Sequence, residues 1–72
     1  MIIKIKQEYD NKVDMHRKTR VYEVKSFSIN YKPNESMTLF LDNDIAIDMN
    51  NKDCVYVMEN GKTVDRYIFI KE

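Results

Sequence analysis

The feature that most constrains this fold is an Asn-Gly pair, Asn60-Gly61, between two runs of β-branched and aromatic residues. Both central residues of a type I′ turn need a positive φ, and Asn-Gly is the pair that adopts this turn most readily. Gly61 is the only glycine of the chain, so no other position has the same backbone freedom. Residues 54–70 are therefore predicted to form a β-hairpin.

Alternation of apolar and polar residues predicts another strand at the start of the chain. Ile3, Ile5 and Tyr9 have one parity, and Lys4 and Lys6 have the other. This two-residue period is typical of a strand with one face in the core and one in water. We expect that strand to span roughly residues 2–9.

The segment 19–31 also alternates, but its apolar positions change phase. They are even up to Val24 and odd from Phe27 onward. A two-residue period cannot change parity without an extra residue or a bend, so we expect a β-bulge or kink near Lys25-Ser26. A strand bent in this way can belong to two halves of a curled sheet.

Residues 27–41 are predicted to pair as a hairpin around a turn at residues 32–35. The only proline, Pro33, sets φ in that turn. Pairing Tyr31 with Met37 places apolar residues opposite apolar residues along both strands, and register follows the apolar face.

The next strand is expected at residues 45–49, after a loop whose length can be tested by parity. A two-residue loop would set Leu39 opposite Asp48 and bury a carboxylate, at a cost of several kcal/mol. A three-residue loop, residues 42–44, sets Leu39 opposite Ile47. We therefore predict the three-residue loop.

The final hairpin has two faces, and its buried face decides its role. One face carries an aliphatic set with one arginine: Val55, Val57, Val64, Arg66, Ile68 and Ile70. The other carries Cys54, Tyr56, Met58, Asp65, Tyr67 and Phe69. A five-residue loop after Met49 buries the first set and a four-residue loop buries the second, and the first set fits a dense β core better. Its burial, with Arg66 paired or reaching water, leaves Tyr56, Tyr67 and Phe69 as an outward aromatic strip and a candidate partner-binding surface. The alternative is that the sheet closes on itself and both faces are covered.

Together these patterns predict one small all-β domain over residues 1–72. The expected architecture is an antiparallel meander of five or six strands, curled into a small barrel or a strongly bent sheet. Residues 10–18 break the alternation and are expected to form a long polar loop. An α+β fold with one short helix within residues 8–18 is the alternative, because Tyr9, Val13 and Arg17 have helical spacing.

No residue cluster indicates catalysis, a metal or a cofactor. Cys54 and His16 are the only cysteine and histidine, which excludes an internal disulfide and leaves a zinc site dependent on carboxylate ligands. The acidic turn at residues 42–48 lacks the glycine and downstream glutamate of an EF-hand loop. A barrel of 72 residues also has little room for a substrate pocket of about 300 Å³. We expect neither an enzyme nor a small-molecule substrate.

A core of this size is marginal, and oligomerisation is the supplement that remains without disulfides or metals. The first functional hypothesis is thus a non-catalytic protein-binding or accessory module that binds a partner protein or itself. The abundance of Asn, Lys and Ile is typical of A/T-rich genomes, including those of phages and mobile elements. The lack of a long apolar run and the single cysteine favour a cytoplasmic protein with no membrane partner.

The second hypothesis is a small-barrel nucleic-acid-binding protein that uses the basic segment 12–20. Residues 1–32 hold eight basic and four acidic residues, and residues 33–72 hold the reverse. The phosphate-contact candidates within this segment are Lys12, His16, Arg17, Lys18 and Arg20. Neighbouring acidic residues and a sequence pI of about 6.6 count against this hypothesis.

Overall fold

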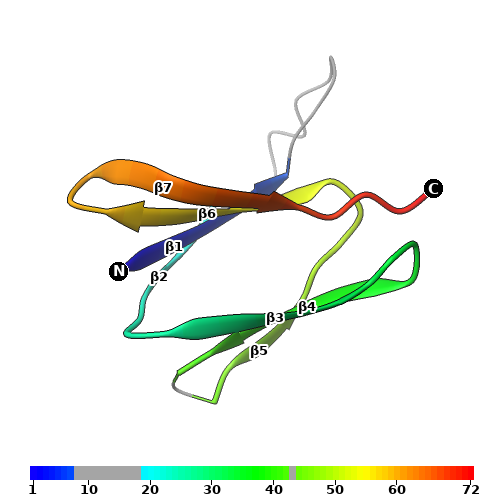
Figure 1. Cartoon of the computed structure of the whole chain (residues 1–72), viewed down its shortest axis with the longest axis horizontal. Coiled ribbons are helices and arrows are strands. Elements are labelled where there is room, and N and C mark those ends of the chain that lie inside the picture. Colours follow the sequence, from blue (N-terminus) through cyan, green and yellow to red (C-terminus); the bar gives the residue numbers. More distant parts are fainter. Residues whose placement is uncertain (8–18, 43) are drawn as a thin grey trace.

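The computed structural model describes residues 1–7, 19–42 and 44–72, which fold into two antiparallel β-sheets (Figure 1). The four-stranded sheet has the order β2-β1-β6-β7. Its strands are β1 (Ile2–Gln7), β2 (Arg20–Glu23), β6 (Asp53–Glu59) and β7 (Lys62–Ile68). The three-stranded sheet has the order β3-β4-β5, with β3 (Phe27–Lys32), β4 (Ser36–Leu41) and β5 (Ala46–Asp48).

The all-β antiparallel class predicted from the sequence is confirmed, but the described residues form seven strands and not five or six, and these make two sheets and not one meander curled into a barrel. β1 pairs with β2 on one side and with β6, which is distant in the sequence, on the other. The strands between them, β3, β4 and β5, form a second sheet of their own. The two sheets lie one above the other in Figure 1. The alternative of a short helix falls on residues 8–18, which lie outside the described part of the chain, as does the expected extension of the first strand to Tyr9.

The predicted kink is the corner where the chain leaves one sheet for the other. β2 ends at Glu23 and belongs to the four-stranded sheet, whereas β3 begins at Phe27 in the three-stranded sheet. Val24 is buried, and its backbone N–H donates to the carbonyl oxygen of Met1 at 3.0 Å. The phase change in the sequence therefore marks the corner correctly.

The predicted registers of β3, β4 and β5 are confirmed. Tyr31 pairs with Met37, and Leu39 pairs with Ile47. The backbone N–H of Leu41 donates to the carbonyl oxygen of Ile45 at 2.9 Å, which closes the three-residue loop.

The core lies between the two sheets and takes inward residues from both. Leu39 and Val55 are completely buried. The other members of the cluster are Ile3, Ile5, Val24, Met37, Leu41, Ile47, Met49, Val57 and Phe69. The side chains that alternate with them point outward, as the two-residue period requires.

The Asn60-Gly61 turn joins β6 and β7 as predicted. φ is 53° at Asn60 and 77° at Gly61, which is the positive pair that a type I′ turn requires. Glu59 pairs with Lys62 directly across this two-residue loop.

A β-bulge in β7 then changes which side chains face the core. Thr63 pairs with Met58 but Asp65 pairs with Val57, so Val64 is the extra residue. The expectation that β6 and β7 share one buried aliphatic face is therefore wrong beyond the bulge. Val55 and Val57 are buried as expected, but the residue that joins them in the core is Phe69, directly after β7, while the expected residues Val64, Arg66, Ile68 and Ile70 are exposed.

The physical reason is the arginine. An uninterrupted ladder would point Arg66 into the core, where burial of an unpaired charge is costly. The bulge leaves Arg66 outside and buries an aromatic ring in its place.

Alanine substitutions at Phe69 and at its neighbour Ile68 test this register. Phe69 is 2% exposed and Ile68 is 41% exposed. We expect Phe69→Ala to lower the free energy of unfolding by about 3–5 kcal/mol, and Ile68→Ala by about 1 kcal/mol or less. Urea denaturation followed by circular dichroism measures both. A larger loss of stability for Ile68→Ala than for Phe69→Ala would show that β7 has no bulge at Val64 and that Ile68, not Phe69, faces the core.

Candidate functional site

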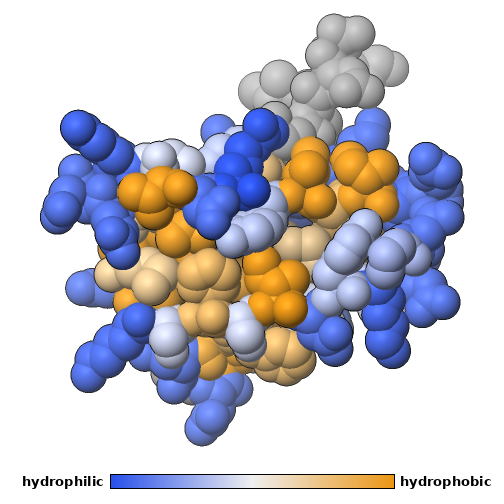
Figure 2. All heavy atoms as spheres, in the orientation of Figure 1, coloured by the Kyte–Doolittle hydropathy of each residue, from blue (hydrophilic) through white to orange (hydrophobic). Residues whose placement is uncertain are grey.

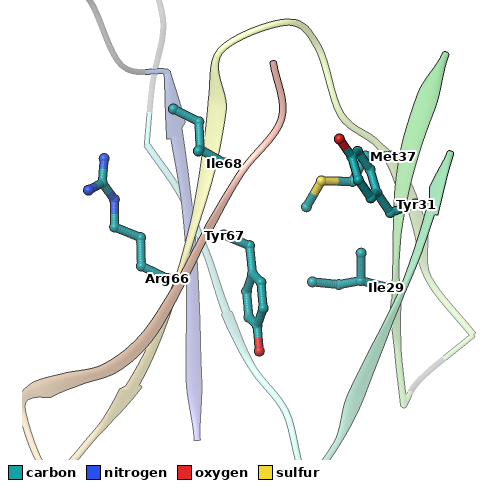
Figure 3. Close-up of a pocket in the computed structure, with 6 residues that line it drawn as sticks. All are labelled: Ile29, Tyr31, Met37, Arg66, Tyr67 and Ile68. Atoms are coloured by element: carbon teal, nitrogen blue, oxygen red, sulfur yellow. The ribbon is translucent and has the colours of Figure 1, made fainter. Parts of the chain in front are cut away.

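An apolar groove of about 470 Å³ lies between β7 and the hairpin of β3 and β4. Its lining residues are Ile29, Tyr31, Met37, Arg66, Tyr67 and Ile68. In Figure 3, Tyr67 extends from β7 toward Ile29, Tyr31 and Met37, which point back at it from the other sheet. The side chains of Arg66 and Ile68 point away, so the groove is formed mainly by Ile29, Tyr31, Met37 and Tyr67.

Two pairs of aromatic rings bridge the sheets beside this groove. The rings of Phe27 and Tyr67 are 6.3 Å apart at 63°, and those of Tyr31 and Phe69 are 6.4 Å apart at 84°. Both are edge-to-face contacts, in which the positive edge of one ring is attracted to the negative face of the other. The two pairs connect β3 with β7 and with the chain just after it, and so set the spacing across the groove.

A hydrogen bond orients the ring of Tyr67. Its hydroxyl donates to Asp65 Oδ2 at 2.7 Å. The other carboxylate oxygen of Asp65 accepts from the backbone N–H of Arg66 at 2.9 Å. The hydrogen bond to Asp65 is the largest cause that raises the pKa of Tyr67 above its usual value, followed by desolvation and the negative charge of Asp65. Tyr67 is thus a protonated hydrogen-bond donor at neutral pH.

The C-terminal tail connects the two sheets. The backbone N–H of Glu72 donates to Asn34 Oδ1, in the turn between β3 and β4, at 2.7 Å. The backbone N–H of Lys71 donates to Asn51 Oδ1 at the same distance. These bonds hold the chain that follows Phe69 against both sheets, next to the Tyr31–Phe69 ring contact.

Exposed apolar side chains concentrate on the strands that border the groove. Eight large hydrophobic residues are exposed in the described part of the chain, and five of them belong to β3, β7 or the tail: Tyr31, Val64, Tyr67, Ile68 and Ile70. Figure 2 shows hydrophobic side chains across the middle of one face, with hydrophilic ones around them. Exposed hydrophobic residues that gather in this way are typical of an interaction surface.

The structure does not form the outward aromatic strip expected from the sequence. Phe69 is buried, whereas Tyr67 is 36% exposed at the groove. Tyr56 lies on the opposite face of the sheet, since it follows the buried Val55 in β6. The bulge is the reason, because it places Tyr67 and Phe69 on the inner face while Tyr56 stays on the outer one.

Of the phosphate-contact candidates, Lys12, His16, Arg17 and Lys18 lie outside the described residues, and only Arg20 can be placed. Its guanidinium Nη2 is 3.8 Å from Oδ2 of Asp53, a carboxylate that is 3% exposed. The same oxygen accepts the backbone N–H of Asn50 at 2.8 Å. Arg20 therefore helps to hold the turn before β6. The role of segment 12–20 in nucleic-acid binding stays a prediction.

Sequence reasoning missed Ile29, Tyr31 and Met37 as groove residues. Their pairing was predicted correctly, but it indicated a covered core face. The signal that could have found the groove is Arg66, because regular alternation would bury its charge in the core. A bulge that keeps Arg66 outside turns Tyr67 toward the other sheet.

Two carboxylates of the acidic turn at residues 42–48 have partners within the protein. The carboxylate of Asp42 accepts the backbone N–H of Lys25 at 3.0 Å, and that of Asp48 accepts the hydroxyl of Thr38 at 3.0 Å. Within the described ranges, no group of three or more His, Cys, Asp or Glu side chains could hold a metal ion. These ranges also contain no helix long and apolar enough to cross a membrane.

No protein-family model matches this chain, and no curated protein or solved structure shows significant similarity to it. The arguments for function therefore come from the geometry of the described residues.

The substitution Asp65→Asn tests the cause of the raised pKa of Tyr67. The amide keeps an acceptor but removes the negative charge, so we expect the pKa of Tyr67 to fall toward about 10. Because folding raises the pKa of Tyr67, the contribution of its hydrogen bond to folding stability is fully present below the unfolded pKa of about 10. That contribution is lost as pH rises through the folded pKa. Tyrosinate absorbance during alkaline titration measures the shift, and Tyr67→Phe identifies the component that belongs to Tyr67. Identical titrations of the wild type and Asp65→Asn would contradict the assignment.

Proposed function

We propose that this chain is a non-catalytic protein-interaction module that dimerises through the groove between β3 and β7. The observation that carries the proposal is the position of the groove between two edge strands. β7 ends the order of the four-stranded sheet, and β3 ends that of the three-stranded sheet. The aromatic groove therefore opens at an edge of the molecule, where another chain can approach it.

The side chains at this edge are those that protein interfaces favour. Tyr31 is 51% exposed, and Tyr67 presents an apolar ring whose hydroxyl is already bonded to Asp65. Tyrosine is enriched at interfaces because a large apolar ring is buried at a small entropic cost. Ile68 of β7 and Ile70 of the tail are exposed as well.

A second copy of the chain is the occupant that fits these observations. An isologous dimer places the same patch of both copies together, so Tyr31 and Tyr67 of one copy would cover those of the other. The net charge of zero at pH 7 means that two copies do not repel each other through their overall charge. A small domain buries a smaller fraction of its surface on folding than a large one does, so apolar surface buried in a dimer adds proportionally more to its stability.

The substitution Tyr31→Lys tests the dimer. We expect the wild type to elute as a dimer at tens of micromolar in size-exclusion chromatography with light scattering. Tyr31→Lys should weaken the dimer at least about tenfold, because the two copies of a buried lysine would lie close together without counter-charges.

The matched control is Phe40→Lys. Phe40 is also an exposed aromatic residue of the three-stranded sheet, but it follows the buried Leu39 and so lies on the sheet's outer face. Phe40→Lys should leave the dimer intact. A wild type that is monomeric at every concentration rejects the proposal, and equal loss in both variants shows that the interface lies elsewhere.

A further inference from the structure

The outer face of the four-stranded sheet carries a cluster of cations around one aromatic ring. Tyr56 pairs with Lys4 of β1 on one side and with Arg66 of β7 on the other. Lys6 lies two residues along β1, on the same face as Lys4. The core residues Ile5 and Val55, by contrast, lie on the inner face. We call Lys4, Lys6, Tyr56 and Arg66 the cationic face.

Direct contacts order this cluster. The Nζ of Lys6 is 5.0 Å from the centre of the Tyr56 ring, and the Cζ of Arg66 is 5.6 Å from it. Both distances lie within the range of cation–π attraction. The Nε–H of Arg66 also donates to the sulfur of the buried Cys54 at 3.1 Å. The guanidinium and the ring are therefore held in place before any ligand arrives.

A polar hollow of about 220 Å³ lies at this cluster. The described residues that line it are Lys4, Lys6, Thr19, Tyr56, Met58 and Thr63, which supply two ammonium groups and three hydroxyls and include no carboxylate. Neither Lys4 nor Lys6 forms an ion pair with any residue that the structure describes. Two glutamates, Glu23 and Glu59, line a separate hollow beside Ile2 and Asn60.

We infer that the cationic face binds the phosphate backbone of single-stranded nucleic acid. Ammonium groups and hydroxyls are the usual phosphate donors, and an aromatic ring on an open sheet face is a platform on which a base can stack. When a base stacks on the ring, the flexible side chain of Lys6 can move to an adjacent phosphate, while Arg66 stays bonded to Cys54. Among the described residues of this face and its hollow, only Arg66 also lines the groove, and only Thr19 belongs to segment 12–20.

The experiment compares two double variants of the full chain. Fluorescence anisotropy follows the binding of labelled 20-nucleotide oligo-dT and oligo-U over a range of salt concentrations. Lys4→Gln with Lys6→Gln should weaken binding at least about tenfold at low salt. It should also reduce the salt slope by about 1.4, since each phosphate contact with a single strand contributes about 0.7.

The matched control is Lys25→Gln with Lys32→Gln. It removes the same charge from exposed positions before β3 and at its end, away from the cationic face. Binding and salt slope should both stay close to those of the wild type. An equal loss in the control would show that only overall charge matters and would overturn the inference.

A second pair of variants tests the ring itself. Tyr56→Leu removes the stacking surface but keeps an apolar side chain, so we expect several-fold weaker binding with the salt slope unchanged. Tyr56→Phe keeps the ring and should bind like the wild type. Thermal unfolding of each variant shows that the fold is retained.

Two other outcomes overturn the inference. One is the absence of any anisotropy change at low salt. The other is binding of phosphatidylserine vesicles, abolished by Lys4→Gln with Lys6→Gln, without binding of either oligonucleotide. Tyr31→Lys should leave oligonucleotide binding intact, so the dimer and the cationic face can fail separately.

Discussion

The structure depends on which face of β7 points at the three-stranded sheet. An unbroken ladder from the Asn60-Gly61 turn would carry Arg66 into the core, and the single extra residue Val64 prevents this. Phe69 then fills the core, and Tyr67 reaches across to the ring of Phe27. The desolvation cost of one guanidinium thus explains the side-chain arrangement of the whole final strand.

The same bulge gives the final hairpin two different surfaces. Its inner face contributes Tyr67 to the apolar groove, and its outer face places Arg66 beside Tyr56. A strand alternates its side chains between two faces, so one shift of register assigns apolar residues to one surface and cations to the other. The proposed dimer and the proposed nucleic-acid site therefore share a structural cause, while Arg66 is the only one of their named residues that borders both.

The corner at residues 24–26 explains why the groove stays open. Because β2 and β3 belong to different sheets, the chain forms two short sheets and not one closed barrel. Closure would have removed the edges at β3 and β7. Two aromatic pairs and the C-terminal tail connect the sheets at this side, but no strand covers it in the described part of the chain.

The sequence by itself determined the elements and their local pairing. The Asn60-Gly61 turn, the phase change near Lys25, and the pairing of Leu39 with Ile47 all follow from alternation and turn chemistry, which act between residues close in the chain. Only the tertiary structure decided the pairing of β1 with β6, the bulge at Val64 and the opening of the groove. Each of these depends on contacts between residues that are distant in the chain, which a local pattern does not show. The bulge in particular avoids the free-energy cost of burying Arg66, and it does so by breaking the regular alternation.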